Sequence, residues 1–344
     1  MTRKKKRHMI PKPVAAHPDS RRAGRVLLIG LMPVMAILAL AAVHARSRDP
    51  EPRSRVDDRR GRIRESPPPD LRADERRRVE ALIEANEAMN RDFEQWFDIA
   101  EEVAGDDAQA RILIEFARSS AVPTMLLPGG ITQFIVTGDV DRALGNQARL
   151  SAEPSEATPR AFEITVADLA RRRAYGMRAL SDWQYDQGRN QLFVPPRARY
   201  SRLYGSILLL HELQHAYDLC TGREPERPSD REWAEGEARA YELELRLVNR
   251  LTNGAASRFA RALADRYRPP GDTRWIWPHQ TPDIGPSLRQ WSRILGEPPA
   301  TEEETGPRGG TLLVLMNREL AEREGLSQDA FLEFILATRS IPPT

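Results

Sequence analysis

The sequence contains a single cysteine, Cys220, among 344 residues. One thiol excludes disulfide bonds within the chain, and it also excludes zinc sites built from several thiolates. Because Cys220 follows a strongly apolar segment, we expect it to be a small core residue rather than a metal ligand or a nucleophile.

Lysine is equally scarce, since all four lysines lie in the first twelve residues and every other basic residue is arginine. The formal net charge of +2 is unevenly distributed. Residues 1–25 carry +8 and residues 46–64 carry +4, which leaves residues 65–344 at −10. A nucleic-acid-binding domain needs a basic patch on its folded body. The acidic body supplies none, so we expect no nucleic-acid partner.

Long apolar segments are rare, and the one at residues 26–45, VLLIGLMPVMAILALAAVHA, has twenty uncharged residues between basic flanks. As a helix it would span about 30 Å, the thickness of a bilayer core. The alternative is a cleaved signal peptide, because Val43-His44-Ala45 resembles a cleavage site. We favour a transmembrane anchor, since the run exceeds the length usual for a signal peptide.

These features divide the chain into four parts. Residues 1–25 form a basic arm, expected in the cytoplasm because they carry slightly more basic residues than the other flank. Residues 26–45 form the transmembrane helix, and residues 46–69, rich in charge and proline, form a flexible linker. Residues 70–344 form a domain expected outside the cytoplasm, or secreted if the signal is cleaved.

The domain is predicted to belong to the α+β class, mostly helical with a small sheet. Hydrophobic spacing predicts helices over 70–104, 107–118, 167–180, 201–220 and 231–249, with further helix to residue 339 apart from an interruption at 268–310. Residues 131–137 are predicted to be a strand, and two short strands around Asp186-Gln187-Gly188 are predicted to form a hairpin that ends at Pro195-Pro196.

The helix at 201–220 carries the main chemical motif, His211-Glu212-Leu213-Gln214-His215. Residues four apart share one face of a helix, so both imidazoles can reach one zinc ion while Glu212 lies beside the bound water. Zinc lowers the pKa of that water to about 7, and a carboxylate there can accept its proton. The surrounding residues are apolar, which predicts a buried helix. A bound metal ion would offset the free-energy cost of burying two histidines and a glutamate. The alternative is a cluster of the same residues that is satisfied by hydrogen bonds without a metal.

A catalytic zinc site needs a third protein ligand and one open position. Thr221 stands where a longer form of the motif has a third histidine, so the next candidates are acidic residues on the following helix. Glu237 lies about 60° from the centre of that helix's apolar stripe and Glu235 about 100° away on the other side. We therefore predict Glu237 as the third ligand, with Glu235 as the second choice.

These residues resemble the gluzincin class of zincin metallopeptidases, in which a helix with H-E-x-x-H is followed by a second helix that supplies a glutamate ligand. The match covers HELQHAYD and the E-A-R-A-Y stretch, within about residues 185–250. The resemblance implies Zn²⁺ as cofactor and Glu212 as general base and acid. It also implies that the strand at 191–194 is the sheet edge along which an extended peptide lies.

Two further residues are candidates for stabilising the oxyanion, a role that the resemblance assigns to Tyr, His or Arg. Tyr241 stands four residues after Glu237, where the family often has an aspartate. The group that orients the imidazoles is therefore left open, and Tyr241 becomes a candidate. His279, in RWIWPHQTPD, is the only other histidine of the domain and is either a second candidate or a surface loop residue.

The sequence thus predicts a membrane-anchored zinc metallopeptidase that acts on peptide or protein substrates. Two alternatives remain: a zinc hydrolase of a non-peptide amide or ester, and a membrane-tethered zinc-binding scaffold or envelope-assembly module. The presence of Glu212 argues against a scaffold, which has no need of a general base.

Overall fold

The structure, a computed structural model, describes residues 69–127, 131–134, 140–155, 157–177, 181–197, 202–281, 284–296 and 305–338. The chain divides into two units, 1–60 and 61–344, and all described residues belong to the second. Among the described helices, none is both long and apolar enough to cross a membrane. The predicted arm, transmembrane helix and linker before Pro69 lie outside the described residues.

Most of the second unit is helical. Its helices are α2 (Pro69–Ala104), α3 (Ala108–Ser120), α4 (Val140–Leu150), α5 (Leu169–Ala174), α6 (Arg202–Cys220), α7 (Asp230–Leu251), α8 (Ala255–Tyr267), the short 3₁₀ helix η2 (Pro278–Gln280), α9 (Ile284–Ile294), α10 (Thr305–Glu324) and α11 (Gln328–Thr338). Its strands are β1 (Ala121–Leu127), β2 (Ile131–Phe134), β3 (Phe162–Val166), β4 (Gln184–Asp186) and β5 (Gln191–Val194). The α+β class with a small sheet is therefore confirmed.

The five strands form one mixed sheet in the order β2-β1-β3-β5-β4. The three inner strands are parallel, and β2 and β4 run antiparallel at the two edges. The predicted hairpin is confirmed, with Tyr185 of β4 opposite Leu192 of β5. The expectation that residues 191–194 form the sheet edge is wrong, because β5 pairs on both sides and is fully buried. On this side the edge strand is β4.

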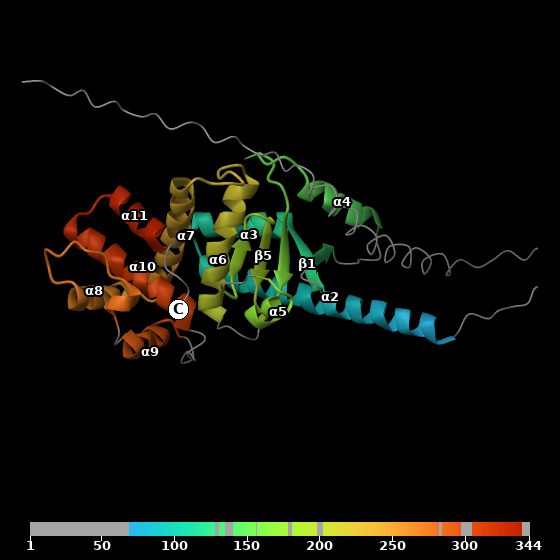
Figure 1. The fold of residues 1–344 in the computed structure, drawn as a ribbon, viewed down its shortest axis with the longest axis horizontal. Helices are drawn as coiled ribbons and strands as arrows, with labels where there is room; N and C mark the ends of the chain where they lie inside the picture. Colours follow the sequence, from blue (N-terminus) through green and yellow to red (C-terminus); the bar gives the residue numbers. More distant parts are fainter. Residues whose placement is uncertain are drawn as a thin grey trace, which may run out of the picture. The chain divides into compact units, whose positions relative to one another are not determined.

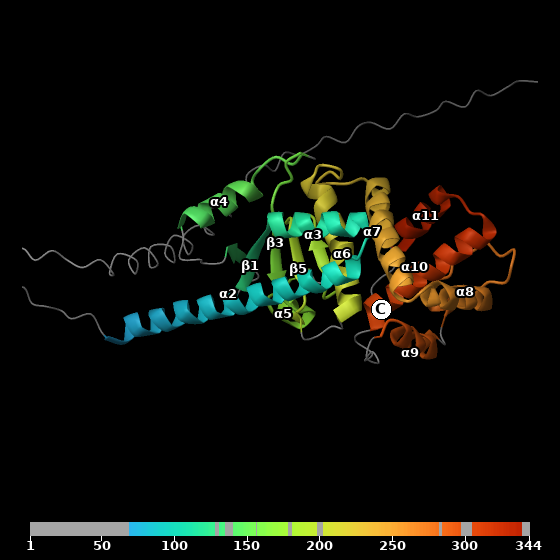
Figure 2. The same ribbon diagram turned by 180° about the vertical axis from the view of Figure 1, so that it is seen from behind.

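Aromatic side chains join the sheet to the helices that cover it. Figure 2 shows α2 and α3 lying across one face of the sheet. Trp96 of α2 meets Trp183 edge to face, with ring centroids 4.7 Å apart. Phe116 of α3 stacks on Phe162 of β3 at 5.2 Å and also contacts Tyr217 of α6 at 5.3 Å. One continuous core therefore fixes α6 relative to the sheet.

Helix α7 lies between α6 and the C-terminal helices α8 to α11, as Figure 1 shows. Ser229 and Glu232 form a reciprocal capping box that fixes where α7 begins. Buried positions occur on more than one side of α7, including Ala234, Ala240 and Leu245, because it packs against α6 and also against α10 and α11. The residues of α7 that face α6 are therefore held rigidly.

The sequence predicted the long helices well and the sheet poorly. Helices α2, α3, α6 and α7 start and end within two residues of the predicted bounds. The prediction of helix over 167–180 is wrong in extent, because α5 ends at Ala174 and Gly176 adopts a φ of +73°. Strands β1 and β3, which form the middle of the sheet, were not predicted. Pro123 within β1 weakens the strand signal there.

Candidate metal centre

His211 and His215 lie one turn apart on α6, and their ring centroids are 5.2 Å apart. Helix α6 is buried for most of its length, so both rings are largely covered by protein. The side chain of His211 is 10% exposed and that of His215 is 16% exposed. The site is therefore held in the core but still open to solvent on one side.

Glu237 of α7 completes the group. Its Oε2 lies 3.7 Å from Nε2 of His211, and its Oε1 lies 3.6 Å from Nε2 of His215. One ligand atom from each of the three residues lies within 4.8 Å of the others. Ligand atoms about 2.0–2.1 Å from a tetrahedral zinc ion are about 3.4 Å from one another, so these separations fit such an ion with small adjustments. The structure brings together the three residues predicted as metal ligands.

Glu235, the second choice for the third ligand, lies elsewhere. Its carboxylate pairs with Arg231 one turn earlier on α7, at 2.9 Å, and its side chain is 40% exposed. It is not part of the group formed by His211, His215 and Glu237. The step of 200° between positions 235 and 237 on a helix accounts for the difference.

The charges around His211 favour a cation at this position. Burial alone would lower the pKa of His211, but hydrogen bonds with Glu237 and Glu244 raise it well above its ordinary value. Burial would raise the pKa of Glu237, but the two histidines lower it overall. Two carboxylates on the same face of α7, two turns apart, thus meet His211 at its two ring nitrogens, and a divalent ion would satisfy the charge of Glu237 in place of a proton.

Glu244 is a residue beside the histidines that the sequence analysis missed. Its Oε2 lies 2.8 Å from Nδ1 of His211, and its side chain is 1% exposed. A carboxylate that accepts the Nδ1 proton leaves Nε2 free and directed at the metal position. Glu244 follows Glu237 by seven residues, or two helical turns, so that spacing was the available signal. This contact answers the question of what orients His211.

Glu212 is placed between the histidines and the sheet edge. Its Oε2 accepts a hydrogen bond from the backbone N–H of Tyr185, at 2.7 Å. In an antiparallel pair, the N–H and C=O of one residue point to the same side. Tyr185 of β4 therefore presents its backbone groups to the outer side of the sheet, where Glu212 lies. The side chain of Glu212 stays partly exposed.

The two candidates for oxyanion stabilisation have different surroundings. The ring of Tyr241 meets that of His211 edge to face, with centroids 4.8 Å apart. Burial, and then the nearby Glu237, raise the pKa of Tyr241 well above its ordinary value, so its hydroxyl remains a hydrogen-bond donor at neutral pH. His279 is exposed in η2 and is not part of the His211, His215 and Glu237 group.

Glu224, in the loop between α6 and α7, is a second buried carboxylate near the site. Its Oε1 accepts a hydrogen bond from Gln187 at 3.2 Å, and its Oε2 lies 3.9 Å from Arg239. Burial raises its pKa, although the charge of nearby His215 acts to lower it. A Cβ atom at Gly236 would lie 2.7 Å from Oε2 of Glu224. The glycine before Glu237 therefore makes room for this carboxylate.

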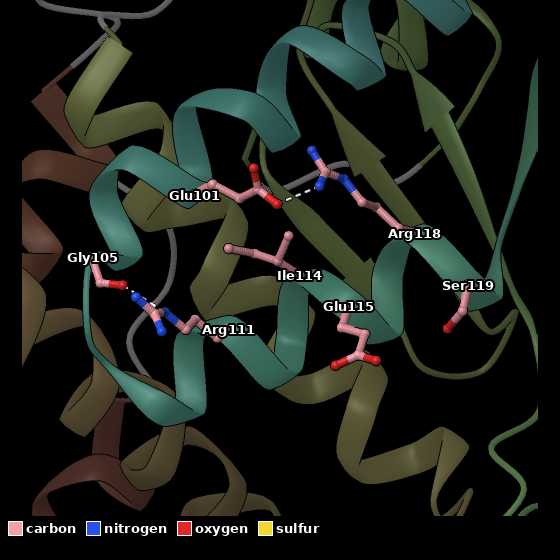
Figure 3. Close-up of a pocket in the computed structure, with 7 residues that line it drawn as sticks. All are labelled: Glu101, Gly105, Arg111, Ile114, Glu115, Arg118 and Ser119. Atoms are coloured by element: carbon pink, nitrogen blue, oxygen red, sulfur yellow. Dashed lines mark hydrogen bonds and ion pairs between the residues drawn. The ribbon is translucent and has the colours of Figure 1, made fainter.

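A separate hollow lies between α2 and α3, away from these residues (Figure 3). Its charged groups are largely satisfied within the protein. Arg118 pairs with Glu101 and with Asp98, and Arg111 donates a hydrogen bond to the carbonyl of Gly105 at 2.6 Å. Because these arginines are already engaged within the protein, they are poor partners for a charged ligand. The group around His211 is therefore the better candidate site.

No protein-family model, curated protein or solved structure matches this chain. The functional conclusion therefore comes from the residues of the site alone.

Proposed function

We propose that this protein is a zinc metallopeptidase of the gluzincin type, with His211, His215 and Glu237 as metal ligands. The observation that carries the proposal is the convergence of these three side chains from two helices, with ligand atoms within 4.8 Å of one another. Two imidazoles and one carboxylate are a ligand set typical of catalytic zinc, and they leave a fourth position open. When bound, zinc would supply a Lewis acid and lower the pKa of a coordinated water.

Glu212 is the proposed general base. It follows a metal ligand on α6 and is the partly exposed carboxylate between the site and β4. Its role is to accept the proton of the attacking water and to deliver it to the leaving amine. Tyr241, whose ring lies against that of His211 and whose hydroxyl stays protonated, is the better of the two candidates for stabilising the oxyanion. His279 is the weaker candidate because it is exposed on a separate segment.

The edge strand favours a peptide as substrate over a small amide or ester. The described part of the sheet ends at β4, and Tyr185 directs its backbone groups away from β5. An extended peptide can pair with such an edge through the Tyr185 carbonyl, since the Tyr185 N–H is already bonded to Glu212. A peptide bound there would have its backbone next to Glu212. We further propose that the apolar run at 26–45 anchors the protein in a membrane with the domain outside.

The variant Glu212→Gln tests this function, because it keeps the size of the side chain and removes the proton acceptor. Zinc content and folding should match wild type, while hydrolysis of a peptide library falls about 100-fold or more. Glu235→Gln is the matched control, since it makes the same change on an exposed residue. Full activity of Glu212→Gln, or a wild-type protein that binds no zinc, would refute the proposal. Wild type and Glu212→Gln that both hold zinc and are both inert would favour the scaffold.

A further inference from the structure

The buried side chains behind His211 connect the metal centre to the C-terminal helix α10. Glu244 has both carboxylate oxygens occupied: Oε2 by His211 Nδ1, and Oε1 by the hydroxyl of Thr311, which donates to it. The hydroxyl of Tyr204 lies 2.8 Å from the Thr311 oxygen. Since the single hydrogen of the Thr311 hydroxyl is given to Glu244, Tyr204 is the donor in that pair.

All three side chains are buried, with exposed fractions of 1% for Tyr204, 1% for Glu244 and 2% for Thr311. An ionised carboxylate at such a position is costly unless its oxygens are hydrogen-bonded. The Thr311 hydroxyl therefore does more than join two helices. It holds the carboxylate in the orientation in which the other oxygen meets Nδ1 of His211.

We propose that Thr311 and Glu244 are positioning residues for the metal ligand His211, so that helix α10 is a required part of the metal centre. This inference rests on the proposed metal site. Thr311 lies 100 residues after His211 in the sequence and acts on the metal only through Glu244. The function of the network is to set the direction and the basicity of the His211 imidazole, and hence the affinity for the ion.

The test measures zinc affinity of the full-length chain by competition with a chromophoric chelator, together with the visible spectrum of the Co²⁺-substituted protein. Thr311→Val keeps the shape of the side chain and removes the hydroxyl, and it should weaken zinc binding about 10-fold. Glu244→Gln should weaken it by about 10- to 100-fold and shift the Co²⁺ bands. Thr311→Ser keeps the hydroxyl that Thr311→Val removes, and this variant should bind zinc nearly as tightly as wild type.

The matched control is Glu319→Gln, two turns further along α10. Glu319 is also buried, with a side chain 5% exposed, and it pairs with Arg261 at 2.7 Å rather than with the site. Its replacement should lower stability and leave zinc affinity and the Co²⁺ spectrum unchanged. If Thr311→Val does not fold, Tyr204→Phe replaces it and should give a smaller loss of affinity in the same direction.

Wild-type affinity and an unchanged Co²⁺ spectrum in both Thr311→Val and Glu244→Gln would overturn the inference and leave the metallopeptidase proposal standing. An equal loss in Glu319→Gln would also overturn it, because the effect would then be a general loosening of α10. A wild-type chain that binds no zinc would instead refute the proposed function, and the role of Thr311 with it.

Discussion

Glu235 and Arg231 form an ion pair one turn apart on α7, and neither belongs to the group formed by His211, His215 and Glu237. Glu237, two residues later, faces both imidazoles at 3.6–3.7 Å. Two acidic residues that are nearly adjacent in sequence are therefore separated by the helical rotation. Only one of them belongs to the site.

The first prediction compares these two residues. Glu237→Gln removes a charged ligand and should lower zinc affinity by at least about 10-fold, because a neutral amide oxygen is a poorer ligand for zinc. Glu235→Gln should lose only an exposed ion pair, which contributes little to stability, and keep full metal content. Elemental analysis of both purified variants decides the matter. The reverse order would mean that Glu235, not Glu237, is the ligand.

The second prediction concerns pH. Because the folded-state pKa of His211 lies well above its ordinary value of 6.5, charged His211 stabilises the metal-free fold. This contribution is complete below the unfolded-state pKa and is lost as pH rises through the folded-state pKa. Zinc competes with the proton, so its affinity should rise over the same range.

Thermal unfolding between about pH 6 and pH 9, with chelator or with zinc, measures both effects. The midpoint of the metal-free protein should fall with rising pH, while the increase in midpoint caused by zinc grows. His279→Ala is the control, because His279 is exposed and lies outside the group. A metal-free midpoint that rises through this range in wild type would show that His211 is neutral before metal binds.

The third prediction concerns Gly236. Alanine is a better helix former than glycine by about 1 kcal/mol, yet its Cβ would lie 2.7 Å from Oε2 of Glu224. We expect Gly236→Ala to destabilise the protein by about 1–3 kcal/mol, because the buried carboxylate has to move. Denaturant unfolding measures the loss. In Gly236→Ala/Glu224→Ala the clash is absent, so the two changes should couple strongly; simple additivity would contradict the steric account.

The fourth prediction concerns the membrane. The twenty-residue apolar run between basic flanks should hold the full-length protein in the membrane fraction, resistant to extraction with high salt. Protease added from the outer side should cleave the domain. A soluble mature form that begins near Arg46 would show instead that the run is a cleaved signal peptide.

The sequence by itself determined the long helices and the place of the motif on one of them. The 3.6-residue spacing of apolar side chains located α2, α3, α6 and α7, because that spacing repeats within each helix. It also placed His211 and His215 on one face, since residues four apart lie together on any helix. Even Glu237 followed from its angular position on α7.

Tertiary structure decided what lies around that motif. Strands β1 and β3 gain their stability from pairing with each other and with the flanking strands β2 and β5, which no local pattern records. The edge position of β4 depends on the order of strands in the sheet. The connection from Thr311 through Glu244 to His211 joins α10 to α7 and α6, from which α10 is separated in the sequence by α8 and α9. Such contacts depend on how the helices pack, so only the folded chain shows which buried side chains contact His211.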